Sequence, residues 1–163
     1  MRSPPEAMQV GAVLENQDWK PDVVITGCTM GHNRARGVLL AAGEKTLVEG
    51  NTFHSPGAAI RIHGDANYWF EAGAMGKIVI RNNHFDRCGY SHFQRWGRAV
   101  ILINPEMQEV RGPYHRRIEI SGNNFTDCPL PSVDARAVGE LAITGNAGLG
   151  EVITTDCGQV VRD

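Results

Sequence analysis

The chain has 163 residues, 42% of them hydrophobic and 21% charged, which is ordinary for a single globular domain. Its formal net charge of -2 gives no electrostatic case for a nucleic acid or an anionic membrane as partner. No apolar run approaches the roughly 20 residues that cross a bilayer, and the start of the chain lacks the apolar core of a signal peptide. The localisation stays open between a cytoplasmic chain, a mature chain and a fragment of a longer protein.

One short pattern recurs along the chain: alternating apolar residues, then Gly or Asn, then Asn, then a large apolar residue. It reads VVITGCTM at 23–30, LVEGNTF at 47–53, IVIRNNHF at 78–85, IEISGNNF at 118–125 and, more weakly, LAITGNAG at 141–148. Aligned on their second apolar residue, the copies lie 23, 32, 40 and 23 residues apart, with the anchors Ile25, Val48, Ile80, Ile120 and Ile143. Each copy is typical of a short strand followed by a Gly/Asn turn.

A second apolar segment separates the copies, at 36–42, 58–64, 98–104 and 132–138. The sequence between the strands has no helical periodicity, so βαβ units are not expected. A unit of two short strands cannot bury its own apolar face and must stack on its neighbours. We therefore predict an all-β fold, a right-handed parallel β-helix of about five coils and of the pectate-lyase-like solenoid type, with two strands in each coil.

The prediction treats residues 1–163 as one β-helix domain, in which the coils occupy 22–148. Residues 149–163 are expected to add one more strand or a cap. The first coil would leave unpaired strand edges, which native solenoids cover or pair. Residues 1–21 are therefore expected to form an N-terminal cap or extension, with Trp19 folded over the first coil. The alternative is that the open end pairs with another copy in a homo-oligomer.

Residues at equivalent positions of successive coils are expected to stack in columns. One column holds polar residues that can hydrogen-bond along a ladder: Cys28, Asn51, Asn83, Asn123 and Asn146. A second column holds large apolar core residues: Met30, Phe53, Phe85 and Phe125. Cys88 and Cys128 each follow a stacked Phe by three residues, so we expect two neighbouring buried thiols, at a spacing that a disulfide would also allow. We interpret these columns as architecture.

The motifs that indicate a metal or a nucleotide are missing from the sequence. The four Cys residues form no CxxC pair, and the six His residues form no HxH or HExxH motif. The chain has neither a GxxxxGK[ST] loop nor a strand–GxGxxG–helix unit. We therefore expect no metal and no other cofactor.

The chemistry is expected on the face that carries the longest connections, at 60–78 and 86–118, because insertions in a solenoid gather on one face. When the second strands are aligned on Ile62 and Ile103, Asp65 comes into register with Glu106. Paired carboxylates are the groups that cleave a glycosidic bond, one as acid and the other as base or nucleophile. The aromatic run after Asp65 could cover the apolar face of a sugar ring.

Each of these residues also has a purely structural interpretation. Asp65 is suited to capping a turn through backbone hydrogen bonds, and Glu106 to solvent or to an ion pair with Arg98. The aromatic residues could cover the sheet, in which case Trp69 would pack down onto the coils. The alternatives to a hydrolase are a non-catalytic glycan-binding or structural β-helix. A polysaccharide lyase is a weaker possibility, because such an enzyme normally has a calcium site of clustered acidic residues, and the sequence has no such cluster.

The segments NRARGVLL, FHSPGAAIRIHGDANYWFEAGA, IRNNHFDRC, AVILINPE and YHRRIEISGNNF together resemble the α-1,3-galactosidases of glycoside hydrolase family 110. The resemblance covers about residues 22 to 148. It implies a right-handed β-helix and the removal of terminal α-1,3-linked galactose with inversion and without a metal, from blood-group-B-type and linear Galα1-3Gal glycans. Members of that family are several times longer, and this chain resembles only their later coils.

If this chain is catalytic, we expect the two carboxylates in register, Asp65 and Glu106, to be the acid and base. The residues expected to bind the α-galactosyl glycan are Arg36, Asn67, Tyr68, Trp69 and Glu71. Because earlier coils with further acidic residues are absent from this chain, the alternative is a substrate-contacting wall without the acid and base.

Overall fold

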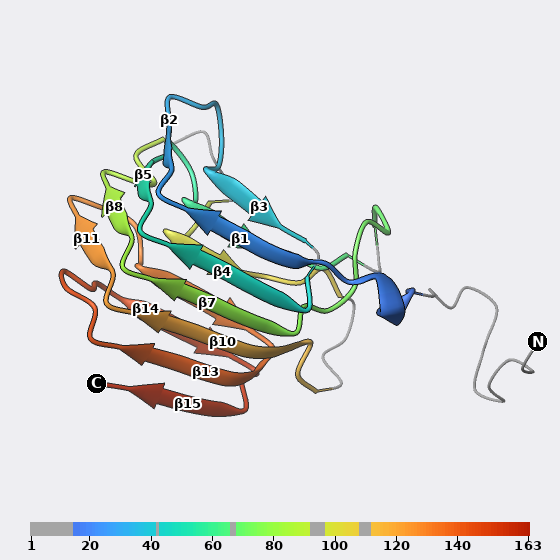
Figure 1. Cartoon of the computed structure of the whole chain (residues 1–163). Coiled ribbons are helices and arrows are strands. Elements are labelled where there is room, and N and C mark those ends of the chain that lie inside the picture. Colours follow the sequence, from blue (N-terminus) through green and yellow to red (C-terminus); the bar gives the residue numbers. More distant parts are fainter. Residues whose placement is uncertain (1–14, 42, 66–67, 92–96, 108–111) are drawn as a thin grey trace, which may run out of the picture.

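The computed structural model describes residues 15–41, 43–65, 68–91, 97–107 and 112–163. Strands stack in parallel into three sheets, which wind around a common interior as a right-handed parallel β-helix (Figure 1). The fold class predicted from the repeats is confirmed. No helix in the part of the chain that is described has the length and apolar character of a membrane span.

The first sheet contains one strand from each copy of the repeated pattern. Its strands, in spatial order, are β1 (Asp22–Thr26), β4 (Lys45–Glu49), β7 (Lys77–Arg81), β10 (His115–Ser121), β13 (Val138–Thr144) and β15 (Gln159–Arg162). Their register aligns the five predicted anchors in one row: Ile25, Val48, Ile80, Ile120 and Ile143. The unequal steps between the copies are therefore confirmed as differences in loop length around a constant strand register.

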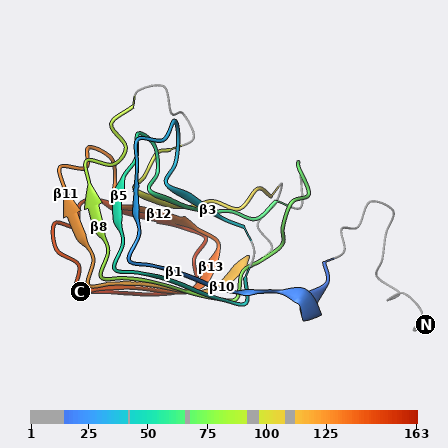
Figure 2. The ribbon, with the colours of Figure 1, turned by 45° about the horizontal axis from the view of Figure 1, so that its top comes forward.

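The second sheet corrects the prediction of two strands in each coil. The residues after each Gly/Asn turn form a third short strand: β2 (Thr29–Gly31), β5 (Thr52–His54), β8 (His84–Asp86) and β11 (Asn124–Thr126). Each is three residues long, which is too short for its alternation to stand out from a turn in the sequence. The four-stranded sheet forms a separate side of the solenoid (Figure 2).

The third sheet is made from the second apolar segments, as predicted. Its strands are β3 (Val38–Leu40), β6 (Ile60–Ile62), β9 (Ile101–Ile103), β12 (Val133–Arg136) and β14 (Val152–Thr155). Ile62 pairs with Ile103 in the register from which the site was predicted. In β6 the side chains of Ile60 and Ile62 enter the core, so Arg61 between them points to the outer face.

The Gly/Asn turns follow from one backbone requirement that repeats in every coil. The residue before each ladder position has a positive φ: Gly27 62°, Gly50 63°, Asn82 54°, Gly122 61° and Gly145 61°. Glycine adopts this left-handed conformation without steric cost, and Asn is the next best tolerated residue. In the first four coils the turn bends the chain from the first sheet into the second, and in the second to fourth coils the Asn that follows is buried.

That following residue forms the predicted polar ladder. Asn83 is representative: its Nδ2 donates to Val48 O at 2.9 Å and to Asn123 Oδ1 at 2.9 Å, and its Oδ1 accepts from Asn51 N at 3.0 Å. The same bonds recur from coil to coil, and Cys28 N donates to Asn51 Oδ1 at the first coil. Buried amides are satisfied only by partners on the neighbouring coils, so the ladder holds the coils in register.

The phenylalanine column is confirmed beside the ladder. The rings of Phe53 and Phe85 are stacked with centroids 5.2 Å apart, and those of Phe85 and Phe125 with centroids 4.8 Å apart. Met30 pairs with Phe53 in the strand register. Cys88 and Cys128 are free thiols and neighbours on consecutive coils, as expected, since Cys88 N donates to Cys128 Sγ at 3.4 Å.

The two ends of the described chain differ from the prediction. Residues 149–163 supply two strands, β14 and β15, where one strand or a cap was expected. A 3-10 helix, η1 (Gln17–Trp19), precedes β1. Trp19 is 84% exposed, so its ring does not cover the first coil. The strands β1, β2 and β3 are edge strands of the three sheets, and pairing of this end with another copy stays a prediction.

Candidate functional site

A pocket of about 650 Å³ lies against the outer face of the third sheet, beside the connections that follow β6 and β9. It contains two carboxylates, two guanidinium groups, an imidazole and two aromatic rings. The lining residues are Arg36, Leu39, Arg61, His63, Tyr68, Trp69, Glu71 and Glu106. The predicted site residues Arg36, Tyr68, Trp69, Glu71 and Glu106 are thus brought together. Asn67 lies outside the described residues.

Asp65 does not line the pocket but lies beneath its aromatic wall. Its Oδ1 accepts from the backbone N of Tyr68 at 2.6 Å, and its Oδ2 accepts from the backbone N of Trp69 at 2.7 Å. Its side chain has no exposed surface. Asp65 therefore caps the turn, which is the structural interpretation offered by the sequence.

The predicted register of the two carboxylate-bearing positions is confirmed all the same. Asp65 and Glu106 form a parallel bridge, and Glu106 N donates to Gly64 O at 2.7 Å. Asp65 N also donates to Ala72 O at 2.8 Å, so the connection folds back on itself as it leaves β6. The backbones of two coils thus fix where the connection starts, and the Asp65 side chain fixes its first turn.

The aromatic residues of this connection project away from the coils. Tyr68 is 69% exposed and Trp69 is 68% exposed, and their rings meet edge to face with centroids 4.9 Å apart. The expectation for a purely structural module, with Trp69 packed down onto the coils, is not met. A large exposed aromatic surface beside polar groups is typical of a binding site for a ligand that has both apolar faces and hydroxyl edges.

Arg61 and His63 are site residues that the sequence analysis did not single out. Arg61 is 9% exposed, and its Nη2 lies 3.3 Å from His63 Nδ1 and 3.4 Å from Glu106 Oε1. Its Nε has no hydrogen-bond partner within the described part of the chain. A buried guanidinium with unused donor capacity, facing a pocket, is suited to bind oxygen atoms of a ligand.

Burial and charge decide the protonation of this basic pair. Burial lowers the pKa of Arg61, and the nearby charge of Arg36 lowers it further. Burial also lowers the pKa of His63, followed by the charge of Arg61. His63 is therefore neutral at pH 7, and its Nδ1 accepts from Arg61. Alternation was the signal for them in the sequence: Arg61 lies within β6 and His63 directly after it, on either side of the inward-facing Ile62, so both face outward.

The two carboxylates of the pocket come from different coils. Glu71 is exposed on the connection after β6, and the Glu106 side chain is 36% exposed directly after β9. Glu106 is held by Arg61, and not by Arg98, the partner considered from the sequence. Arg98 instead pairs with Asp134 on β12. The arrangement can present one carboxyl group held by an ion pair and one exposed carboxyl group to a ligand covered by aromatic rings.

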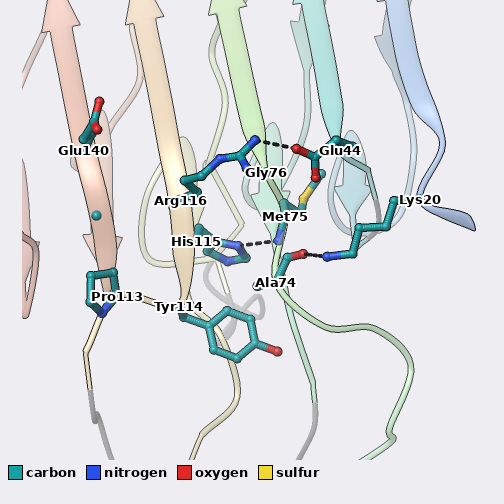
Figure 3. Close-up of a pocket in the computed structure, with 11 residues that line it drawn as sticks. Lys20, Glu44, Ala74, Met75, Gly76, Pro113, Tyr114, His115, Arg116 and Glu140 are labelled. Carbon is teal, nitrogen blue, oxygen red and sulfur yellow. Dashed lines mark hydrogen bonds and ion pairs between the residues drawn. The ribbon is translucent and has the colours of Figure 1, made fainter. Parts of the chain in front are cut away.

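A second pocket of about 490 Å³ lies where the strands of the first sheet begin (Figure 3). There Lys20 donates to Ala74 O at 2.6 Å, and His115 accepts from Met75 N at 3.2 Å. Tyr114 also lines this pocket, and its ring packs on the backbone of Gly64: a Cβ on Gly64 would lie 2.2 Å from Tyr114 Cε1. Tyr114 therefore joins the second pocket to Gly64, where the connection that forms the wall of the first pocket begins.

Within the described ranges, no group of three or more His, Cys, Asp or Glu side chains is placed to hold a metal ion. In the larger pocket Glu106 is paired with Arg61, and the carboxylates lie beside aromatic rings, which suits an organic ligand with hydroxyl groups.

Fold and pocket together define a parallel β-helix protein with a loop-built side pocket. Residues 10–150 match the family described as right handed beta helix region, and the chain belongs to this family.

Similarity to curated proteins narrows the class of protein further than the family does. An α-1,3-galactosidase B of Bacteroides thetaiotaomicron is 41% identical over 144 residues, covering 87% of this chain and 23% of the relative. An α-1,3-galactosidase B of Akkermansia muciniphila is 38% identical, covering 87% of this chain and 18% of the relative. An α-1,3-galactosidase A of Shewanella woodyi is 38% identical, covering 73% and 19%. The resemblance found in the sequence is confirmed, and the chain spans about a fifth of these relatives.

Proposed function

We propose that this chain forms the galactoside-binding side pocket of a glycoside hydrolase that removes terminal α-1,3-linked galactose with inversion. The observation that carries the proposal is the pocket of about 650 Å³, which joins two carboxylates from different coils with two exposed aromatic rings. The similarity to relatives named α-1,3-galactosidase supports the choice of sugar. Because the chain spans only 18% to 23% of these two relatives, the activity is a property we propose and test below.

We assign acid and base catalysis to Glu106 and Glu71. Both line the pocket, whereas Asp65 would have to break two backbone hydrogen bonds before it could reach a sugar. The role expected for Asp65 from the sequence therefore passes to Glu71, and Asp65 becomes a positioning residue for the aromatic turn. An inverting mechanism needs room for one water between the carboxyl groups, at a separation of roughly 6.5–9.5 Å once substrate is bound.

The remaining groups of the pocket suit the two faces of a galactose ring. One face of galactose is apolar and can lie against Trp69 or Tyr68, whose rings are free to receive it. The hydroxyl groups on the other side can accept hydrogen bonds from Arg61 and Arg36. Arg61 loses little side-chain entropy on binding, because the strand and its contact with Glu106 already hold it in place.

Binding without cleavage is the second candidate function. It is favoured by one observation: both carboxylate oxygens of Asp65, which is in register with Glu106, accept backbone hydrogen bonds from the turn. In that case the chain would supply the wall of a site whose acid and base lie in other coils.

The test is proton NMR of the chain mixed with Galα1-3Gal, in which the anomeric signals are followed over hours. The proposed function predicts free galactose, with the β-anomer first. Glu106→Gln and Glu71→Gln should each lower kcat/KM by at least about 100-fold, as the loss of a general acid or base does. Glu151→Gln, at an exposed site away from the pocket, serves as control and should have no effect.

The possible outcomes separate the candidates. Saturation transfer to the sugar without any product identifies the binding wall. Release of the α-anomer first, or full activity in both Gln variants, contradicts the proposed mechanism. No product together with no saturation transfer contradicts both candidate functions.

A further inference from the structure

The thiols of Cys88 and Cys128 occupy the same position of two consecutive coils. Each follows the short strand of its coil by two residues, after β8 and β11. The sulfur of Cys88 lies 3.4 Å from Phe53 O, and the sulfur of Cys128 lies 3.5 Å from Phe85 O. Both side chains therefore point toward the preceding coil, and Cys128 Sγ accepts from Cys88 N at 3.4 Å.

The backbone spacing meets the requirement of a disulfide, and only the Cys88 side chain, whose sulfur lies against Phe53 O, has to rotate toward Cys128. The parallel pairing of β8 with β11 places successive coils one strand spacing apart, about 4.8 Å, which falls within the Cα separation of disulfides, about 4.4–6.8 Å. Stacking of Phe85 on Phe125 holds the two strands in register beside the thiols. Neither of the other cysteines shares this position, since Cys28 lies in the turn of the first coil and Cys157 contacts Ala135.

We propose that Cys88 and Cys128 are a redox modification site, a thiol pair that is converted reversibly into a disulfide linking the third coil to the fourth. The oxidant is a low-molecular-weight disulfide such as oxidised glutathione.

The reaction proceeds by two thiol–disulfide exchanges. The hydrogen bond with the Cys88 side chain lowers the pKa of Cys128 to about 7, whereas the same bond and burial raise the pKa of Cys88. The Cys128 thiolate attacks one sulfur of oxidised glutathione and releases one reduced glutathione. The Cys88 thiol then loses its proton and attacks the Cys128 sulfur, which releases the second. Two protein thiols are oxidised, and one glutathione disulfide is reduced to two thiols.

The bond would stiffen the part of the solenoid that carries the larger pocket. Cys88 stands at the start of the connection that leads to β9, after which Glu106 enters the pocket. The cross-link also closes a loop between residues 40 positions apart, which restricts the unfolded chain. We therefore expect the oxidised protein to melt several degrees above the reduced protein.

The experiment incubates the folded chain with excess oxidised glutathione, blocks the remaining thiols in urea and measures intact and tryptic masses. We expect an intact mass lower by about 2 Da before blocking, for the two hydrogen atoms transferred. The tryptic peptides 88–95 and 118–136 should be joined, and reduction should separate them. The variant in which Cys28 and Cys157 are both Ser should give the same result.

A Cys128→Ser variant tests the assigned order of attack. It should form no cross-link, and its buried Cys88 should react with glutathione at least tenfold more slowly than Cys128 does in a Cys88→Ser variant. The proposal is overturned if the native chain yields only glutathione adducts, each heavier by about 305 Da, or if the bond joins Cys28 or Cys157. It is also overturned if the cross-link forms only in urea.

Discussion

Acidification is expected to destabilise this protein through His115, which is completely buried. Burial, together with the smaller effects of His63 and Lys20, lowers the pKa of His115 from an ordinary value of 6.5 to about 4. Between these two values the unfolded chain binds a proton that the folded chain does not. The stability is therefore complete above pH 6.5 and is lost as the pH falls toward 4, by about 3 kcal/mol in total.

The structure also identifies the bond that a proton would break. His115 Nδ1 accepts from Met75 N at 3.2 Å, so the neutral ring carries its hydrogen on Nε2, which has no partner in the described part of the chain. Protonation at Nδ1 would turn this acceptor into a donor facing another donor. It would also place a second positive charge near Lys20, which binds the neighbouring residue Ala74 (Figure 3).

The assay is urea unfolding at pH 7.5 and pH 5.0. The native chain should lose about 2 kcal/mol more between these pH values than His115→Asn, whose Oδ1 can still accept from Met75 N but does not titrate. His32→Asn, at an exposed position, serves as the matched control and should behave like the native chain. Equal losses in the native chain and in His115→Asn would refute the reasoning.

Two further predictions concern the architecture. Asn83→Ala should lower the free energy of unfolding by about 3–5 kcal/mol, because it leaves buried amide and carbonyl groups of the neighbouring coils unpaired. Asn82→Gly, one residue earlier at a φ of 54°, should be neutral or slightly stabilising, and equal urea midpoints for the two variants would contradict the ladder. Gly64→Ala should cost about 2 kcal/mol, because the new methyl group meets the ring of Tyr114. The cost should largely disappear in a Tyr114→Ala background, and strict additivity of the two changes in a thermal or urea assay would rule out this contact.

The repeat was readable from the sequence because a β-helix turns sequence equivalence into spatial contact. Each strand meets the same position one coil away, so the anchors Ile25 and Val48 could be aligned without knowledge of the connections between them. The ladder around Asn83 and the stack around Phe85 followed from the same alignment. The register of Asp65 with Glu106 was predicted in this way and is confirmed.

The connections between the strands do not repeat, so their contacts could be learned only from the tertiary structure. The sequence placed Asp65 beside Glu106 but could not tell that two amides of the next turn would occupy both carboxylate oxygens. It did not single out Arg61, because the burial of an outward-facing strand residue depends on what the connections place over it. The strand repeat of this protein can be predicted from its sequence alone. The residues that form its pocket depend on the connections, whose contacts are set by the whole fold.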